Sequence, residues 1–263
     1  MEYETILLQQ DGGIAILTLN RPTHLNAFTL QMSEEFLDAV VRCYSNQNVK
    51  ALVLTGAGEA FSAGGDVKAM AELLESDPST FFRKLTTNLD GVVATLIRMP
   101  KPVIGAVNGV AAGAGFAMAL ACDLLVASAK ARFKMAFTGI GLTPDCGVTY
   151  FLPRLIGVKR VVEMAWSNRE LSADDALNMG IVNEVVAEAD LLSRVRTVGA
   201  QLAQGPLAAI GRAKALIYEG LGDHLETQME RERNAIADSS LTADFREGIL
   251  AFQARRHPKF IGN

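Results

Sequence analysis

Two turns rich in glycine and alanine could bind a ligand through their backbone N–H groups. One is Ser62-Ala63-Gly64-Gly65-Asp66, and the other runs from Gly109 to Gly115; each follows an apolar run and opens a helical pattern. Helix N-termini expose unpaired N–H groups that carry partial positive charge, and small side chains let a ligand approach them. Two such turns facing one cleft would form an oxyanion hole, in which losing one donor costs roughly 3–4 kcal/mol. Plain helix-start packing would also explain glycine at these positions.

Several other chemistries lack their residues. The three histidines, His24, His224 and His257, lie in polar stretches and are interpreted as solvated surface residues. Neither a GxSxG elbow nor a GxxxxGK[ST] loop is present, and the spacing of Gly109, Gly113 and Gly115 is not GxGxxG. These observations argue against a serine hydrolase, a nucleoside triphosphatase and a nicotinamide enzyme.

Composition sets further limits. The 263 residues have a net charge of −4 and no Lys/Arg block interleaved with aromatics, so nucleic acid is not an expected partner. Cys43, Cys122 and Cys146 are widely spaced, which argues against a disulfide framework or a metal site. No signal peptide is visible, and the longest apolar stretch, from 109 to 121, is too short to span a membrane, so we expect a cytoplasmic protein.

The elements that must hold the two turns have an α/β pattern. Strands are expected over Thr5–Gln9, Ile14–Leu19, Val49–Thr55, Val103–Val107 and Leu124–Ala127. The first two read as a hairpin. Helices are expected over Leu30–Tyr44, Val67–Leu74, Ser79–Ile97 and Gly113–Ala121. After about Val186 the pattern is helical to the end, with breaks at Gly205-Pro206 and Gly220–Asp223. We therefore predict a core over residues 1–190 and a helical segment over 191–263.

The motifs, in content and order, resemble the enoyl-CoA hydratase/isomerase (crotonase) superfamily over nearly the whole chain. The strings that carry the resemblance are Asn20-Arg21-Pro22, Leu25-Asn26-Ala27, Phe61-Ser62-Ala63-Gly64-Gly65-Asp66, Lys101-Pro102-Val103-Ile104-Gly105-Ala106-Val107-Asn108-Gly109, Cys122-Asp123-Leu124, Leu171-Ser172-Ala173-Asp174-Asp175-Ala176, Gly180-Ile181-Val182-Asn183 and the ending Phe252, Arg255-Arg256, Phe260.

The resemblance implies a crotonase-like spiral of ββα turns followed by helices that form a homotrimer, or a hexamer built as a dimer of trimers. It also implies an acyl-CoA thioester substrate, with coenzyme A belonging to the substrate and no separate cofactor. By motif, the thioester oxygen would lie between the N–H groups of Gly65 and Ala114. The coenzyme A portion would meet the segments that contain Ala27, Ala63, Asp66 and Val67.

Within the superfamily, the hydratases carry two glutamates, and neither is present in this chain. The matching positions are Ala117 in the helix after the second turn and Phe137 in Met135-Ala136-Phe137. Hydration needs one group to activate water and another to protonate carbon, ordinarily two carboxylates. The sequence therefore disfavours a hydratase-type lyase.

Asp145, in Gly141-Leu142-Thr143-Pro144-Asp145-Cys146-Gly147, is the carboxylate that remains in this neighbourhood. A Pro-Asp pair that precedes a helical pattern favours a helix N-terminal acid. The same context resembles the 1,2-epoxyphenylacetyl-CoA isomerase branch of phenylacetate catabolism and related enoyl-CoA isomerases of fatty acid metabolism, which use an aspartate at this place. On that basis Asp145 is the expected catalytic residue.

A single carboxylate is sufficient for isomerisation. Asp145 would take a proton from one end of an enoyl-CoA and return it at the other, shifting a double bond from Δ3 to Δ2, while the two N–H donors stabilise the enolate. The apolar residues Phe116, Phe137 and Leu142 would raise its pKa and line the substrate site. In the epoxide branch the same polarisation assists ring expansion to an oxepin.

Three alternatives remain. An aroyl-CoA dehalogenase would use Asp145 as a nucleophile, although no residue marks an aryl-halide pocket. A Clp-type peptidase shares the spiral fold, but no histidine lies near either glycine turn to activate Ser62. A non-catalytic coenzyme A-binding member would have lost both glutamates without a replacement. Cys146 reads as a small buried residue, but its place beside Asp145 singles it out.

Overall fold

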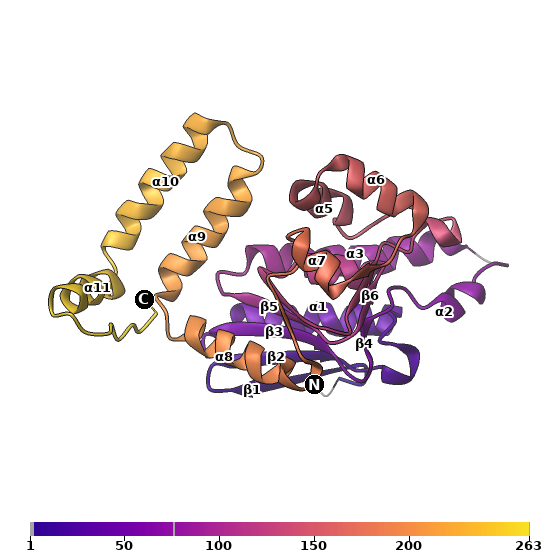
Figure 1. Cartoon of the computed structure of the whole chain (residues 1–263), viewed down its shortest axis with the longest axis horizontal. Helices are drawn as coiled ribbons and strands as arrows, with labels where there is room; N and C mark the ends of the chain where they lie inside the picture. Colours follow the sequence, from indigo (N-terminus) through magenta and orange to yellow (C-terminus); the bar gives the residue numbers. More distant parts are fainter. Residues whose placement is uncertain (1–2, 76, 263) are drawn as a thin grey trace.

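The computed structural model describes residues 3–75 and 77–262, which form two sheets and a series of helices (Figure 1). Within this part, a six-stranded sheet has the order β1 (Ile6–Asp11), β2 (Ile14–Leu19), β3 (Ala51–Gly56), β5 (Val103–Val107), β7 (Leu124–Ser128), β10 (Glu184–Val186). A sheet of four short strands has the order β4 (Ala60–Ser62), β6 (Val110–Ala112), β8 (Arg132–Lys134), β9 (Leu171–Ser172).

The chain winds between the two sheets as a spiral. From β3 it enters β4 in the smaller sheet, returns to β5, enters β6, and then repeats the step through β7 and β8. The successive partners pair in parallel in both sheets, while β1 and β2 form the expected antiparallel hairpin. The first glycine-rich turn continues from the end of β4 towards α2, and the second contains β6 and leads into α4, so the two lie at corresponding steps of the spiral. This repetition brings them to the same end of the molecule.

The helices cover the sheets and continue beyond them. Their bounds are α1 (Leu30–Ser45), α2 (Val67–Ala71), α3 (Pro78–Arg98), α4 (Ala114–Leu120), α5 (Val148–Ile156), α6 (Val158–Ser167), α7 (Ala173–Asn178), α8 (Leu191–Ala203), α9 (Leu207–Gly220), α10 (Leu225–Ser240) and α11 (Ala243–Gln253).

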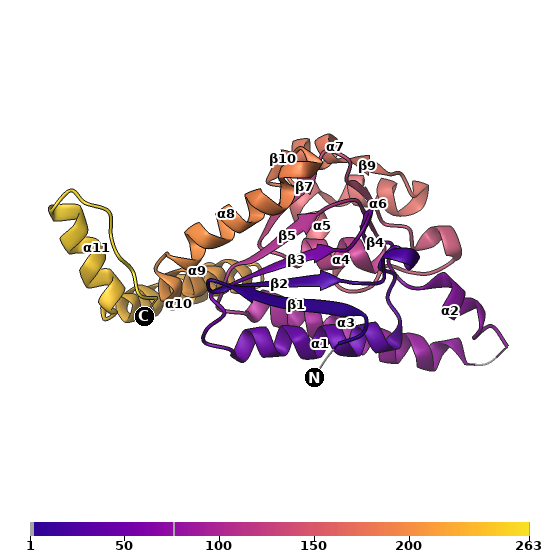
Figure 2. The ribbon, with the colours of Figure 1, turned by 90° about the horizontal axis from the view of Figure 1, so that it is seen from below.

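Alternate residues of the larger sheet pack on different helices. Leu17 and Leu54 belong to the buried cluster that includes Phe36 of α1, whereas Ile16 and Val53 pack against Val195 of α8. Side chains on a strand alternate between its two faces, so one apolar strand supplies both layers. Figure 2 shows α1 and α3 along one face of this sheet and α8 along the other.

The C-terminal helices leave much apolar surface exposed. In Figure 1, α10 and α11 project away from the sheets. Between α9 and residue 262, the large apolar side chains that are at least 60% exposed are Ile217 of α9, Leu225 and Ile236 of α10, Leu241, Phe252 and Ile261. By contrast, α8 is integrated into the core through its buried residues Leu191 and Val195. The part of the predicted 191–263 segment that stands off the sheets therefore begins after α8.

The predicted bounds of some buried strands match the structure, whereas the predicted ends of several helices differ from it. The predictions for β2 and β5 match the structure, and α1 and α3 differ from theirs by one residue at each affected end. The predicted extension of α2 to Leu74 is wrong, because the helix ends at Ala71. The chain is also not helical to its end, since residues 254–262 follow α11 without regular structure.

Candidate active site

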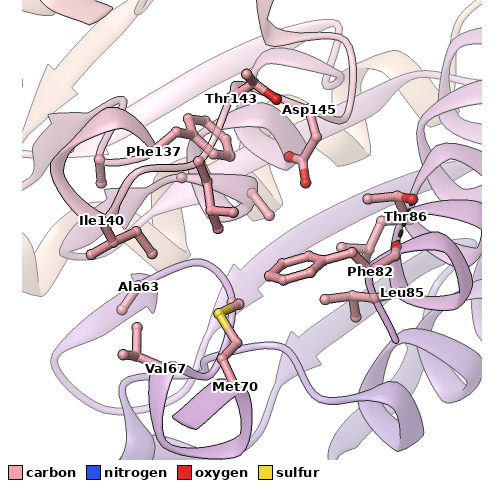
Figure 3. Close-up of a pocket in the computed structure, with 16 residues that line it drawn as sticks. Ala63, Val67, Met70, Phe82, Leu85, Thr86, Phe137, Ile140, Thr143 and Asp145 are labelled. Atoms are coloured by element: carbon pink, nitrogen blue, oxygen red, sulfur yellow. Dashed lines mark hydrogen bonds between the residues drawn. The ribbon is translucent and has the colours of Figure 1, made fainter. Parts of the chain in front are cut away.

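A cavity of about 470 Å³ lies where both glycine-rich turns, α2, α3 and the loop before α5 meet (Figure 3). Its wall is largely apolar. The side chains that line it are Ala63, Val67, Met70, Phe82, Leu85, Thr86, Leu89, Ala136, Phe137, Ile140, Leu142, Thr143 and Asp145, and backbone is contributed by Gly65, Gly113 and Ala114. Asp145 is the one ionisable side chain among these residues, so any proton transfer by a side chain inside the cavity depends on it.

The two turns are packed against each other, which fixes their N–H groups. A Cβ built on Gly115 would overlap the Ser62 carbonyl oxygen, and one built on Gly64 would crowd the backbone around residue 113. Only glycine allows the two backbones to approach this closely. Gly64, with φ of +93°, is also in a region that other residues rarely adopt.

Gly65 and Ala114 place unused backbone donors at the cavity. The hydrogen bonds from Phe28 N–H to Gly64 O and from Asp66 N–H to Phe28 O pass on either side of Gly65. Ala114 is the first residue of α4, where a helix has no acceptor for the N–H group. Within the described residues, neither N–H has a hydrogen-bond partner. Both residues line the cavity, as an oxyanion hole requires.

Asp145 is half-buried on the cavity wall and is not used as a helix cap. Gly147 is the N-cap of α5, and Asp145 accepts the Val148 N–H only through its main-chain oxygen. The side-chain Oδ1 is buried and has no hydrogen-bond partner in the described part of the chain. Burial raises the pKa of the Asp145 carboxyl, the neighbouring Cys146 thiol opposes this rise, and the Asp90 carboxylate adds to it. Such a carboxyl is suited to accept and return a proton.

The positions matched to the hydratase glutamates hold no proton carrier. Ala117 is fully buried in α4, and Phe137 forms part of the cavity wall. The structure thus combines two backbone donors with one carboxyl and lacks a second carboxyl on the described cavity wall.

Comparison with known proteins identifies the family to which this chain belongs. The family model described as enoyl-CoA hydratase/isomerase matches residues 9–263. The chain belongs to the enoyl-CoA hydratase/isomerase family. It is 38% identical to a probable enoyl-CoA hydratase from Rhodobacter capsulatus over 100% of both chains. It is 37% identical to a 1,2-epoxyphenylacetyl-CoA isomerase from Escherichia coli, over 98% of this chain and 99% of that one.

The fold comparison agrees with the family. A crystal structure of an enoyl-CoA hydratase from Bacillus anthracis superposes with a TM-score of 0.93 at 30% identity, covering 99% of this chain and 100% of that one. The expected crotonase-like α/β spiral with C-terminal helices is confirmed. Relatives within this family carry names for different reactions, so the family name alone leaves the reaction of this chain open.

Some of the other predicted binding residues line the cavity, and others do not. Ala63, Val67, Phe137 and Leu142 are on the wall, and their contact with substrate stays a prediction. The predicted residues Ala27 and Asp66 are both buried and are not among the residues that line the cavity. Arg21 connects them, because it donates hydrogen bonds to both.

Asp66 stabilises the start of α2. It accepts the N–H groups of Lys68 and Ala69 and forms an ion pair of 2.9 Å with Arg21. Arg21 also donates to the main-chain oxygen of Ala27. Burial opposes ionisation of Asp66, but the hydrogen bonds from Arg21 and Ala69 outweigh it and lower the pKa of this carboxyl. A contact of Ala27 or Asp66 with coenzyme A outside the cavity remains a prediction.

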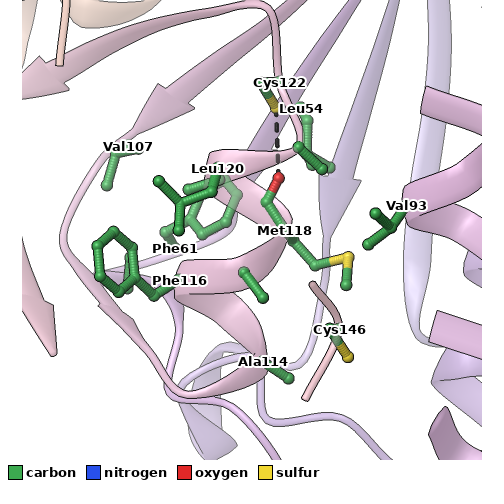
Figure 4. Close-up of a cluster of buried hydrophobic side chains, with 14 of the residues drawn as sticks. Leu54, Phe61, Val93, Val107, Ala114, Phe116, Met118, Leu120, Cys122 and Cys146 are labelled. Carbon is green, nitrogen blue, oxygen red and sulfur yellow. Dashed lines mark hydrogen bonds between the residues drawn. The ribbon is translucent and has the colours of Figure 1, made fainter. Parts of the chain in front are cut away.

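The structure corrects the expected place of Phe116. This side chain is fully buried among the apolar residues of the core (Figure 4). It packs on Phe133, with ring centroids 5.5 Å apart. Successive helical residues are rotated by about 100°, so Phe116 lies roughly opposite Ala114 on α4. It therefore faces the core and is absent from the cavity wall.

We call the side of the cavity formed by α2 and α3 the acyl side, after the group that we expect it to bind; the sequence did not predict it. Phe82, Leu85, Thr86 and Leu89 form a stripe on α3, and Met70 reaches in from α2. In Figure 3, Met70 points towards the space between Val67 and Phe82. The spacing of the α3 residues indicates one face of a helix. It does not indicate whether that face contacts protein or substrate.

The residues that the structure describes contain no group of three or more His, Cys, Asp and Glu side chains arranged to hold a metal ion. None of their helices is long and apolar enough to cross a membrane.

Proposed function

We propose that this protein is an acyl-CoA isomerase that works through a thioester enolate, with Asp145 as the proton shuttle. Its reaction would be the shift of a double bond from Δ3 to Δ2 in an enoyl-CoA, or the isomerisation of 1,2-epoxyphenylacetyl-CoA to the oxepin. The observation that carries the proposal is the composition of the cavity wall: two backbone donors, at Gly65 and Ala114, and one ionisable side chain.

For the enoyl substrate, each step uses these groups only. The thioester oxygen accepts hydrogen bonds from the N–H groups of Gly65 and Ala114, which stabilise negative charge as it develops there. The Asp145 carboxylate takes a proton from C2, and the electron pair is delocalised over the dienolate. The same carboxyl then returns the proton to C4, which leaves the double bond between C2 and C3. One base serves both steps, so no second acid is required.

Hydration is disfavoured because neither Ala117 nor Phe137 carries a carboxyl group. Adding water to a conjugated enoyl-CoA needs a group that activates water and a group that protonates carbon. The described cavity wall provides one carboxyl, and its apolar side chains leave few partners for an ordered water molecule. The hydratase name of one relative describes that protein, whereas the relative named as an epoxide isomerase suits the single carboxyl of this chain.

The cavity also suggests the substrate class. The cavity is lined by Phe82, Leu85, Leu89 and Phe137, and these apolar side chains favour an uncharged aliphatic or aromatic acyl group. Coenzyme A would enter as part of the substrate, and no separate cofactor is proposed. The exposed apolar residues of α9–α11 would be buried in a homotrimer or a dimer of trimers.

The test is an activity comparison between the wild-type protein and Asp145→Asn. Each is incubated with 3-hexenoyl-CoA and, separately, with crotonyl-CoA, and the absorbance of the conjugated enoyl thioester is followed. We expect the absorbance to rise with 3-hexenoyl-CoA in the wild type only, and to change little with crotonyl-CoA. Conversion of 1,2-epoxyphenylacetyl-CoA is measured in parallel by chromatography.

The outcomes separate the alternatives. Rapid hydration of crotonyl-CoA would contradict the interpretation of Ala117 and Phe137. Equal activity of Asp145→Asn and wild type would remove Asp145 from the mechanism. If neither the enoyl nor the epoxide substrate is converted, the isomerase proposal fails and binding without catalysis replaces it.

A further inference from the structure

The described cavity wall carries two hydroxyl groups in addition to the Asp145 carboxyl. Thr86 belongs to the stripe on α3, and Thr143 lies on the loop that leads to Asp145. The other side chains of this wall are apolar, so these three residues supply the polar side chains that a bound acyl group would meet there. A hydroxyl has one proton to donate, and its existing partners decide whether a ligand can receive it.

The Thr86 hydroxyl is already used within its own helix. Its Oγ1 lies 2.7 Å from the main-chain oxygen of Phe82 and 3.3 Å from that of Arg83. Threonine in a helix often donates to the carbonyl four residues earlier, and this contact occupies the one proton of the hydroxyl. Thr86 therefore has no donor left for a substrate.

The Thr143 hydroxyl has no hydrogen-bond partner in the described part of the chain. The residue is exposed on the cavity wall, so the hydroxyl is open to water in the free protein. A substrate that fills the cavity displaces this water. A hydrocarbon acyl group would then leave the hydroxyl unpaired, which is unfavourable, whereas an acyl group with an oxygen atom would accept its hydrogen bond.

The main chain fixes Thr143 beside Asp145. Before the pair, the N–H of Leu142 donates over 3.1 Å to a main-chain oxygen of the preceding turn; after it, the main-chain oxygen of Asp145 accepts the N–H of Val148, also at 3.1 Å. Pro144 separates the two residues and has a fixed φ. In Figure 3, Thr143 and Asp145 lie next to each other on one side of the cavity. The hydroxyl and the carboxyl therefore face the same part of a bound ligand.

This arrangement suits one of the two substrates considered above. Asp145 is proposed to take a proton from C2 of the acyl group. In 1,2-epoxyphenylacetyl-CoA, C2 is bonded to a ring carbon that carries the epoxide oxygen. A donor on the same short loop as Asp145 is therefore near this oxygen when Asp145 is near C2. In 3-hexenoyl-CoA the same region holds only carbon and hydrogen.

We propose that Thr143 is a specificity-determining residue, whose hydroxyl donates a hydrogen bond to an oxygen atom of the acyl group close to C2. The protein then favours an oxygenated acyl-CoA, such as the ring epoxide, over a hydrocarbon enoyl-CoA. The inference deepens the proposed function and rests on it for the kinetic consequences. Recognition of the oxygen atom is a property of binding and can be measured without turnover.

The experiment compares Thr143→Val and Thr143→Ser with the wild type. Valine has the shape of threonine and lacks the hydroxyl, whereas serine keeps it. Thr87→Val is the matched control, because Thr87 is also an exposed threonine, but its hydroxyl donates to the Arg83 main-chain oxygen and its side chain is not on the cavity wall. Thermal denaturation first establishes that each variant is folded. Values of kcat/KM are then measured with 1,2-epoxyphenylacetyl-CoA and with 3-hexenoyl-CoA.

The loss in Thr143→Val should depend on the substrate. We expect kcat/KM to fall about tenfold with the epoxide, the effect of one hydrogen bond between neutral groups, and to change less than about twofold with 3-hexenoyl-CoA. Thr143→Ser should keep most of the activity on the epoxide, and Thr87→Val should match the wild type on both substrates. Thr86→Val should affect the two substrates alike, because the Thr86 hydroxyl is committed to Phe82.

A second readout does not need activity. Isothermal titration calorimetry measures the binding of 2-hydroxyphenylacetyl-CoA and phenylacetyl-CoA, which differ by one oxygen atom and which the proposed reactions do not convert. We expect the wild type to bind the hydroxylated compound about tenfold more tightly. Thr143→Val should lose most of this preference, and Thr87→Val should retain it.

The results separate failure of this inference from failure of the proposed function. Equal losses on both substrates in Thr143→Val, or a valine variant as active on the epoxide as the wild type, would overturn the role of Thr143. A wild-type protein that converts 3-hexenoyl-CoA better than the epoxide would overturn the preference for an oxygenated acyl group and leave the isomerase proposal intact. A wild-type protein inactive on both would overturn the proposed function, while calorimetry would still decide whether Thr143 recognises an oxygen atom.

Discussion

Gly64 and Ala112 are in such close contact that a Cβ built on Gly64 would lie 2.9 Å from the Ala112 carbonyl oxygen. This contact joins the turn that carries the Gly65 N–H to the turn that carries the Ala114 N–H. The geometry of the proposed oxyanion hole therefore depends on the absence of a side chain at residue 64, and a first prediction follows from this contact.

Gly64→Ala should separate the two donors. We expect kcat with an accepted acyl-CoA substrate to fall about 100-fold, the effect of removing one oxyanion donor. Gly12→Ala is the matched control: Gly12 also has a positive φ, +54°, but has no atom within 4 Å of the added Cβ. It should lose about 1 kcal/mol of stability and keep its kcat. Steady-state kinetics and urea denaturation of both variants test this prediction, and equal losses of kcat would contradict it.

Asp145→Asn should make the folded protein more stable at neutral pH. Burial raises the pKa of this carboxyl in the folded state. Its contribution to stability is therefore fully present below the unfolded pKa of about 3.9 and is lost as the pH rises through the folded value. The asparagine has no charge to bury, so the variant should gain in thermal midpoint relative to the wild type as the pH rises. Calorimetry from pH 4 to pH 8 would show it; a constant difference would argue against a raised pKa.

Asp66→Ala should destabilise the first turn and α2. The change removes the helix cap and leaves the Arg21 guanidinium without its carboxylate partner. We expect a loss of about 2 kcal/mol in the free energy of unfolding. Because the folded pKa of Asp66 is lowered, this contribution is present above the unfolded pKa and declines as the pH falls through the folded value. Urea denaturation at pH 7 and pH 3 should therefore show a smaller difference at the lower pH.

Met70→Ala should widen the acyl side of the cavity. A Cβ built on Gly65 would overlap the Met70 methyl group, so this side chain covers the first turn. With it removed, we expect kcat/KM to rise roughly tenfold for a bulky aromatic acyl-CoA relative to 3-hexenoyl-CoA. Met229→Ala, at a half-exposed position on α10, is the control and should not alter the ratio. An unchanged ratio in Met70→Ala would place the acyl group elsewhere.

The exposed apolar residues of the C-terminal helices predict self-association. Sedimentation velocity should give a mass near three or six times that of one chain. The double variant Leu241→Asp, Phe252→Asp should have a lower mass. Both side chains are 85% exposed in the single chain, and an aspartate at either position would place a charge in the interface that we expect to bury them. Leu74→Asp is the control, since Leu74 is also exposed but follows α2, far from α10 and α11 in Figure 1. A wild-type monomer would refute this prediction.

The sequence predicts those elements whose apolar residues are continuous and bounded by turns. β2 and β5 are such runs, and their bounds match the structure. The helical pattern that follows Pro144-Asp145 begins only at Val148 in α5, because Cys146 and Gly147 both have positive φ, which the sequence does not reveal. Those two residues turn the chain before the helix begins. The expected capping role of Asp145 therefore disappears, and its side chain is directed to the cavity wall.

For the site, the motifs predicted the residues that supply the backbone donors and the carboxyl, but not all of the side chains that line the cavity around them. Gly65, Ala114 and Asp145 line one cavity, as the resemblance implies. Phe116 was expected there and lies in the core, because adjacency in sequence does not tell which side of α4 a residue occupies. The α3 stripe that contains Phe82 and Leu89 was missed, since periodicity cannot distinguish a helix face that contacts protein from one that faces an empty cavity.

The contact between the two glycine-rich turns has a consequence for how this fold could acquire new reactions. The groups that we propose to polarise the thioester belong to the main chain, so substitutions of cavity side chains leave them in place. The proposed proton carrier is a side chain on a separate loop, and other positions on the wall, such as Phe137, are occupied by residues that a single substitution could replace with an acid. Activation of the substrate is thus inherited with the backbone, while the fate of the enolate can evolve one side chain at a time.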